Sequence, residues 1–178
     1  MLETTMASLL ILISAHLPTQ KAGQGECLQT AYALYSDAQR AYQNDLHRMI
    51  MVHDPALRGL SEAVLNEQLN ANAARRRAFE ATLRTNPRAL RTNLAVNSWL
   101  NWNREQRDSL RQVDPEYARL LRDASRWRAR VSNHPDLTRL QRVLQEKVVP
   151  SKEHDSVHKR LRAAIEAATK ACVGKGRW

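Results

Sequence analysis

Glycine is scarce in this sequence of 178 residues, which contains 5 glycines and only one, Gly59, between residues 26 and 173. The nucleophile elbow of hydrolases, the P-loop of nucleotide-binding proteins and the dinucleotide-binding turn each need glycine at fixed positions. Their absence argues against these classes of enzyme. The same glycine-poor body is rich in Ala, Leu, Arg, Glu and Gln, which lose little rotamer freedom in a helix. We therefore expect an all-α protein that is not an enzyme and needs no cofactor.

Long apolar runs are also missing. The most apolar stretch, Leu9 to Ile13, falls far short of the ~18 apolar residues of a transmembrane helix, so no stable membrane span is expected. Its length suits the apolar region of an export signal, and Pro18 and small or polar residues follow it. Against this, Glu3 has the wrong charge for such a signal, and no Lys or Arg precedes the run.

The front of the chain therefore allows two interpretations. In the first, residues 1–25 form a cleaved signal peptide with a short polar spacer, removed after Ala15 or Gly25, and residues 26–178 form a single helical domain. The mature protein is then periplasmic or secreted. In the second, the apolar run belongs to the fold and the protein is cytoplasmic.

Cysteine is limited to Cys27 and Cys172. An even pair in an exported chain is most simply a disulfide. This disulfide would join the first helix to the last and hold the two Cα atoms within about 7 Å. Neither cysteine has C-x-x-C spacing, which argues against thioredoxin-like and c-type haem proteins. In a cytoplasmic protein both thiols would stay reduced.

Prolines mark the expected helix boundaries. Asp54, Asn86 and Asp114 each stand directly before a proline, a pair typical of a helix start, because the side chain caps the helix and proline needs no N–H in the first position. Ser151 is a further candidate N-cap. Short connections favour antiparallel neighbours, and we expect a bundle of about five to six helices. The expected helices are 27–52, 61–84, 87–112, 115–132, 136–149 and 151–172.

The net charge is +10, carried by 22 Arg and 6 Lys. Arginine pairs with carboxylates and phosphates through two parallel hydrogen bonds, so the composition predicts an anionic partner. Four arginines follow one another at helical spacing in the expected helix 115–132, with only Asp123 near enough in sequence to neutralise them. These are Arg119, Arg122, Arg126 and Arg130. They form either a solvated face or a binding surface for an acidic protein, an envelope polyanion or nucleic acid.

Trp99 and Trp102 lie three residues apart in the expected helix 87–112, among several asparagines. Paired tryptophans on one helical face usually belong to the core, because they bury a large apolar area. The neighbouring asparagines make this face wetter than a typical core. The alternative is a partner groove anchored by the two tryptophans.

Two histidines, His154 and His158, lie four residues apart in the last expected helix, with Asp155 between them. The string resembles the helix of zinc proteases of the zincin type, with aspartate in place of the glutamate that acts on the bound water. No third ligand is apparent, and two imidazoles leave a zinc site incomplete. We therefore expect no tight metal site there.

Residues 137–141 read Leu-Thr-Arg-Leu-Gln and are similar to the LTxxQ pattern of a family of small basic periplasmic stress chaperones. The similarity covers one copy of five residues, and a capping box formed by Thr138 and Gln141 explains it physically. The pattern does not assign the chain to that family.

Together these features favour an exported basic helical protein that works by binding an acidic partner, as an adaptor, an inhibitor or immunity protein, or a chaperone-like holder. The alternative is a nucleic-acid-binding helical protein of the cytoplasm or of a phage. A metal-dependent enzyme is less favoured, because it rests on His154 and His158 alone. The partner and the oligomeric state are left open.

Overall fold

A computed structural model describes residues 20–172, which contain six α-helices and no β-strand. This confirms the all-α prediction. The α-helices are α1 (Gln20–His53), α2 (Arg58–Thr85), α3 (Arg104–Val113), α4 (Pro115–Ser132), α5 (Leu137–Val143) and α6 (Lys152–Lys170). The shorter turns are η1 (Pro55–Leu57), η2 (Pro87–Ala89), η3 (Val96–Ser98) and the π-helical turn η4 (Leu144–Val148).

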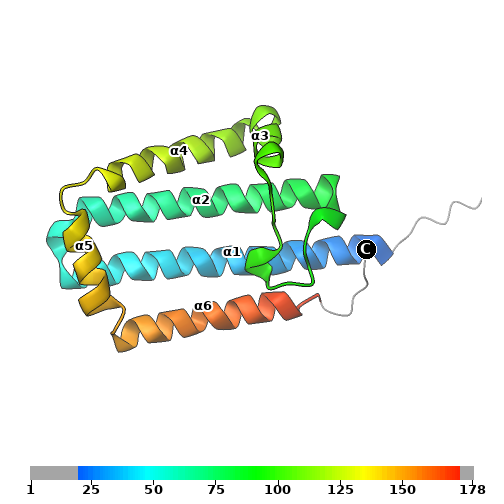
Figure 1. The fold of residues 1–178 in the computed structure, drawn as a ribbon. Coiled ribbons are helices and arrows are strands. Elements are labelled where there is room, and N and C mark those ends of the chain that lie inside the picture. Colours follow the sequence, from blue (N-terminus) through cyan, green and yellow to red (C-terminus); the bar gives the residue numbers. More distant parts are fainter. Residues whose placement is uncertain (1–19, 173–178) are drawn as a thin grey trace, which may run out of the picture.

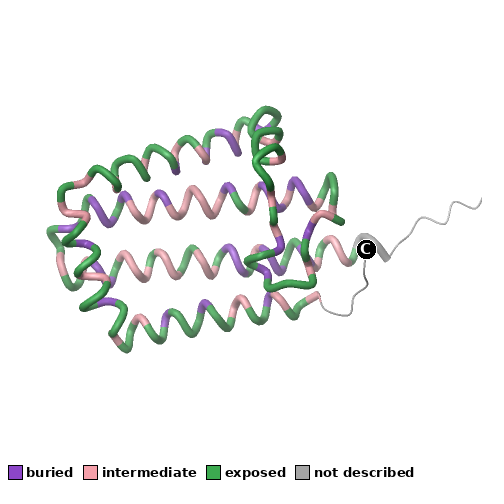
Figure 2. The backbone as a smooth tube through the Cα atoms, viewed as in Figure 1, coloured by how far each residue is buried: buried purple, intermediate pink, exposed green. Residues whose placement is uncertain are grey.

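The four long helices lie side by side in the order α6, α1, α2, α4 (Figure 1). Each runs antiparallel to its neighbour, as the short connections predict. Two segments cross this row near its opposite ends. Helix α5 contacts α1 and α2 at the end where these two helices are joined, and η3 contacts α1 and α6 nearer the other end. Figure 2 shows the middle helices α1 and α2 mostly buried or intermediate, whereas α6 at one edge is mostly exposed.

Side-chain caps form at two of the helix starts that the sequence predicts. The Asp114 carboxylate accepts a hydrogen bond from the Tyr117 backbone N–H at 2.9 Å, and Ser151 Oγ accepts one from the His154 N–H at 3.1 Å. At Asp54 and Asn86 the side chain makes no such bond. The Asp54 carboxylate instead pairs with Arg139 across the molecule, at 2.7 Å.

The prediction of one helix over 87–112 is wrong. After η2 the chain runs irregularly, forms the short turn η3, and becomes α-helical again only at Arg104. This stretch is rich in Asn, Ser and Thr, whose side chains compete for backbone hydrogen bonds and weaken a helix. Three of its apolar residues, Leu90, Val96 and Trp99, are buried and pack in a cluster with residues of α1. The restart is fixed by a capping box between Asn103 and Gln106.

The capping box predicted within residues 137–141 is also wrong. Helix α5 begins at Leu137 with Asp136 in the N-cap position, and no side chain caps it. Thr138 therefore lies inside the first turn of the helix, where its hydroxyl cannot act as the N-cap acceptor. The helix expected over 136–149 is α-helical only to Val143 and continues directly as the π-helical turn η4 to Val148.

Buried side chains form three clusters between the helices. The first joins α1, α2, α6 and the irregular segment, the second joins α1 and α2 to α5, η4 and the start of α6, and the third joins α2 to α4. The first consists of Leu28, Ala31, Tyr32, Tyr35, Phe79, Leu90, Val96, Trp99 and Ala168. The second consists of Met49, Ile50, Leu57, Leu60, Leu140, Val148 and Val157. The third consists of Ala74, Ala78, Tyr117 and Leu120.

Cys27 and Cys172 form a disulfide with their Cα atoms 5.8 Å apart. This confirms the predicted pairing and its distance limit. The bond links the N-terminal part of α1 to the second residue after the end of α6, and these two terminal helices of the described chain lie side by side. The loop that it closes spans 145 residues of sequence.

No helix within residues 20–172 is long and apolar enough to cross a membrane. The apolar run of the predicted signal and the cleavage position after Ala15 lie outside the described residues. The other candidate position, after Gly25, lies inside α1, which begins at Gln20. Cleavage there would remove the first turns of that helix and leave Cys27 near the new terminus.

Candidate binding surfaces

The arginine row, which we define as Arg119, Arg122, Arg126 and Arg130, lies on α4 at the edge of the helical row, and all four residues are exposed. The prediction that only Asp123 could neutralise them is wrong. Arg119 also pairs with Glu116, at 2.7 Å, in addition to Asp123 at 2.9 Å. The hydrogen bond from Arg119 holds the pKa of the Glu116 carboxyl below its usual value.

The remaining three arginines of the row make no close ion pair within residues 20–172, so their charges can pair with a partner. Arg126 comes no closer than 3.9 Å to Asp123, and that carboxylate already accepts a short hydrogen bond from Arg119. Arg130 stacks on the Trp127 ring, with its guanidinium carbon 4.5 Å from the ring centroid. Arg122 has no carboxylate within ion-pair distance in the part of the chain that the structure describes.

The two tryptophans considered as partner anchors have different environments. Trp99 is 1% exposed and packs in the first cluster, with its Nε1 donating to the Leu94 carbonyl at 2.9 Å. It is a core residue and cannot contact a partner directly. Trp102 is half-buried, donates from Nε1 to Thr82 Oγ1 at 2.8 Å, and meets the edge of Tyr117 with ring centroids 6.1 Å apart. The two side chains share no helical face, because the segment between them is irregular.

His154 and His158 lie together, with parallel rings whose centroids are 5.9 Å apart. The Tyr42 hydroxyl of α1 lies 3.2 Å from His154 Nε2, and Asp155 forms an ion pair with Lys159. Within residues 20–172 no group of three or more His, Cys, Asp or Glu is arranged to hold a metal ion. His154 therefore links α6 to α1 through its contact with Tyr42.

A cleft of about 450 Å³ lies between α2 and α4, below the segment that leads into α3. Its aliphatic residues come from α2, α4 and the irregular segment at Leu100, and three aromatic and three basic side chains surround them. The aromatic residues are Tyr32, Trp102 and Tyr117, and the basic residues are Arg75, Arg107 and Arg128. We call this hollow the basic cleft.

The charges of the basic cleft are only partly balanced. Arg128 pairs with the buried carboxylate of Glu67 at 2.7 Å. Arg75 and Arg107 have no carboxylate within ion-pair distance among the described residues; Arg107 donates instead to the Trp102 carbonyl at 3.2 Å. Burial raises the pKa of the Tyr117 hydroxyl, and the positive charge of Arg107 opposes that rise.

Sequence reasoning missed the basic cleft, because its residues come from separate segments of the chain. Arg75 belongs to a run of three arginines, of which Arg76 and Arg77 make ion pairs with other elements. Arg107 belongs to α3 and Arg128 to α4. Nothing in the local spacing indicates that these residues meet.

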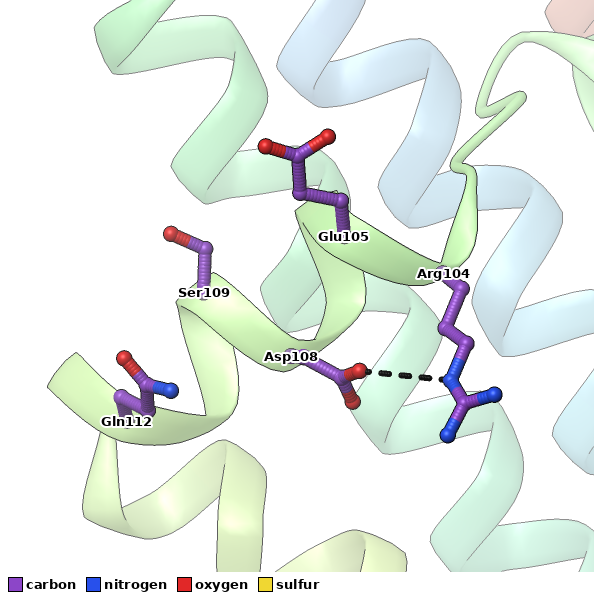
Figure 3. A pocket seen from close by; sticks show the side chains of 5 residues that line it. All are labelled: Arg104, Glu105, Asp108, Ser109 and Gln112. Atoms are coloured by element: carbon purple, nitrogen blue, oxygen red, sulfur yellow. Dashed lines mark ion pairs between the residues drawn. The ribbon is translucent and has the colours of Figure 1, made fainter.

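Two other hollows lie near α3. One follows its outer surface and is lined by Arg104, Glu105, Asp108, Ser109 and Gln112 (Figure 3). All five residues are exposed, and Arg104 and Asp108 lie 3.6 Å apart, so their charges largely cancel. The second, of about 280 Å³, lies between α3 and the end of α2, and its described lining has no charged residue.

No protein family matches this chain, and no curated protein or solved structure is significantly similar to it. The class of protein is therefore the one that the fold itself defines, an all-α helical bundle with an exposed row of arginines on α4 and three arginines lining the basic cleft. The function has to be argued from these two surfaces.

Proposed function

We propose that this protein works by binding an acidic protein partner through the arginine row of α4, outside the cytoplasm. It would act as an adaptor, an inhibitor or immunity protein, or a chaperone-like holder, and would catalyse no reaction. The observation that carries the proposal is the exposed group Arg122, Arg126 and Arg130 on one helix at the edge of the fold. Of these three, only Arg126 has an acidic neighbour among residues 20–172, at 3.9 Å.

The position of α4 supports a protein interface. Its inner side packs against α2, with Tyr117 and Leu120 buried there. Arg122, Arg126 and Arg130 are all exposed on this helix, so their hydrogen-bonding groups are available to a partner. Such a surface can steer an acidic partner and pair with its carboxylates.

The disulfide supports a location outside the cytoplasm. Disulfides persist mainly in oxidising compartments, and the Cys27–Cys172 geometry is that of a bonded pair. A periplasmic or extracellular protein meets little nucleic acid, so this observation favours a protein or an envelope polyanion as the partner. Nucleic-acid binding remains the alternative outcome of the test below.

The test uses the full chain, with its disulfide formed, as bait in extracts from the compartment where it is found. The test variant carries Arg122→Gln and Arg126→Gln. The control variant carries Arg40→Gln and Arg142→Gln, which lose the same charge at two exposed arginines on α1 and α5 that make no ion pair within residues 20–172.

We expect an acidic protein to be retained by the wild type and by the control. The affinity of the test variant for the purified partner should fall by about tenfold at low salt, with a smaller difference at high salt. Equal affinity of both variants would mean that the arginine row is only a solvated face. Retention of unrelated DNA and RNA sequences, with a steep salt dependence, would replace the proposal by the nucleic-acid alternative.

A further inference from the structure

The basic cleft differs from the arginine row in construction. None of the four residues of the row lines it. Instead, the cleft is framed by α2, α4 and the chain around Leu100, and the Tyr32 side chain of α1 contributes to its lining. A ligand in the basic cleft would therefore touch at least three elements, whereas a partner of the arginine row needs to touch only α4.

The floor of the basic cleft is apolar and made of small residues. Four alanines of α2 and α4 contribute to it, together with Leu100 and Leu121. The alanines are Ala71, Ala74, Ala78 and Ala124. Small side chains leave room between two packed helices, and the volume of about 450 Å³ lies within the range of ordinary small-molecule sites.

Aromatic rings border this floor. Trp102 and Tyr117 meet edge to face, with an angle of 67° between their planes, and their hydrogen bonds and burial fix them. Aromatic walls of this kind favour a flat apolar ligand, which stacks or packs against ring faces.

The charged groups of the described lining are all guanidiniums, which only donate hydrogen bonds. Arg75 and Arg107 bring two positive charges without a carboxylate partner in the described chain, and Asn97 and Ser125 add neutral polar groups. No acidic residue within residues 20–172 lines the basic cleft. A cation is therefore disfavoured here, and an anion gains two charge-assisted hydrogen-bonding partners.

We infer that the basic cleft binds a small organic anion with a flat apolar body, of the class of aromatic carboxylates and sulfonates. The apolar body lies on the alanine floor, beside the contacting rings of Trp102 and Tyr117. The anionic group faces Arg75 and Arg107 at the edge of the cleft. This site is separate from the proposed protein interface and stands without it.

Two fluorescent probes of nearly the same shape test the inference. 1-Anilinonaphthalene-8-sulfonate carries an anionic group on a flat aromatic body, and N-phenyl-1-naphthylamine is its neutral counterpart. Both are titrated into the full oxidised chain and into three variants. One carries Arg75→Gln and Arg107→Gln, one carries Ala71→Phe to fill the floor, and the control carries Arg40→Gln and Arg142→Gln.

We expect the sulfonate to bind the wild type and the control with equal affinity, and the Arg75→Gln, Arg107→Gln variant about tenfold more weakly. The neutral probe should bind more weakly than the sulfonate and be indifferent to the arginine changes. The Ala71→Phe variant should lose both probes without any change of charge. Far-UV circular dichroism and a cooperative melting curve show that each variant is folded.

Three results would overturn the inference. The first is no sulfonate binding to the wild type. The second is an equal loss of sulfonate affinity in the Arg75→Gln, Arg107→Gln variant and in the control, which would indicate attraction by net charge alone. The third is unchanged binding to the Ala71→Phe variant, which would place the probe elsewhere. The arginine row is intact in every protein of this experiment, so its outcome does not depend on the proposed function.

Discussion

Helix α2 packs against its two neighbours by different means. On the side of α1, the Phe79 ring lies parallel to Tyr32 with ring centroids 3.9 Å apart, and Trp99 packs against Phe79. On the side of α4, the buried contacts are made by the alanines Ala74 and Ala78. The first interface is built on aromatic residues of both helices, whereas in the second α2 contributes small alanines and α4 contributes the larger Tyr117 and Leu120.

Ion pairs supplement the second interface. Arg77 of α2 donates from Nε to both carboxylate oxygens of Asp114, at 2.6 and 2.8 Å, at the start of α4. Farther along, Arg128 of α4 pairs with Glu67 of α2 at 2.7 Å. Apolar burial does not depend on pH, whereas the Arg77–Asp114 pair does, because it holds the pKa of the Asp114 carboxyl below its usual value. The comparison indicates that the attachment of α4 at Asp114 depends on charge, whereas the contact of α2 with α1 at Phe79 depends on aromatic packing.

Breaking the disulfide should have the largest effect on stability. Cys172 packs against the first cluster, which contains the aromatic residues of α1 and α2. For Cys27→Ser with Cys172→Ser we expect the free energy of unfolding to fall by up to about 5 kcal/mol, because a long loop in the unfolded chain is released. Urea unfolding of the oxidised and variant proteins measures it. Reducing agent should lower the midpoint of the wild type and leave that of the variant unchanged; a wild type insensitive to reduction contradicts the prediction.

Truncating the aromatic cluster should rank next. Trp99→Ala removes a fully buried ring, and we expect a loss of about 3 to 5 kcal/mol in the free energy of unfolding. Trp127→Ala on α4 is the matched change at a half-buried position and should cost distinctly less. Thermal unfolding followed by circular dichroism compares them. If both variants lost the same free energy of unfolding, the aromatic cluster would not contribute more to stability than the packing of α4.

The charge-dependent attachment of α4 is tested at Asp114. Burial opposes its ionisation, but the hydrogen bonds from Arg77 and from the Tyr117 N–H outweigh burial and place its pKa below the usual value. The stabilisation is therefore complete above the unfolded pKa of about 4 and is lost as the pH falls through the folded pKa. Asp114→Asn should destabilise by about 1 to 2 kcal/mol at neutral pH, since Arg77 is partly exposed.

The pH dependence gives the sharper measurement. Urea unfolding at a series of pH values should show the difference between wild type and Asp114→Asn shrinking below about pH 4. Asp37→Asn is the control, because this carboxylate is 62% exposed and makes only a 3.6 Å contact with Arg76. A constant difference at all pH values would mean that Asp114 acts through its shape and not through its charge.

Neutralising the arginine row should have the smallest effect on stability. Arg122→Gln with Arg126→Gln removes exposed charges that hold nothing in place, so we expect a change within about 0.5 kcal/mol. Relief of like-charge repulsion along α4 could even make it slightly stabilising. Thermal unfolding of this variant checks the expectation. A large loss would show that the row contributes to the fold, and would make any loss of binding ambiguous.

Part of the fold could be predicted from local pattern alone. The caps at Asp114 and Ser151 formed as predicted, because a cap depends on residues three positions apart in one segment. The helix over 87–112 failed because nothing local shows that Leu90, Val96 and Trp99 must reach the same core. There, tertiary packing outweighs helix propensity.

The candidate surfaces divide in the same way. The arginine row could be found in the sequence, since four residues at helical spacing on a well-formed helix share a face whatever surrounds them. Its pairing could be predicted only in part, and Glu116 was missed although it lies three residues before Arg119. The basic cleft could not be found, because Arg75, Arg107 and Arg128 come from three helices.

The sequence by itself determined the helical class, the positive charge and the capacity of Cys27 and Cys172 to form a bond. These follow from composition and from spacing within single segments, which act over a few residues. Only the tertiary structure decided that α6, α1, α2 and α4 form one row and that Trp99 is core while Trp102 borders a cleft. It also decided that Arg75 and Arg107, which have no carboxylate partner within residues 20–172, lie beside an apolar floor. Those outcomes depend on which surfaces pack together, and that choice is made by contacts between residues far apart in the chain.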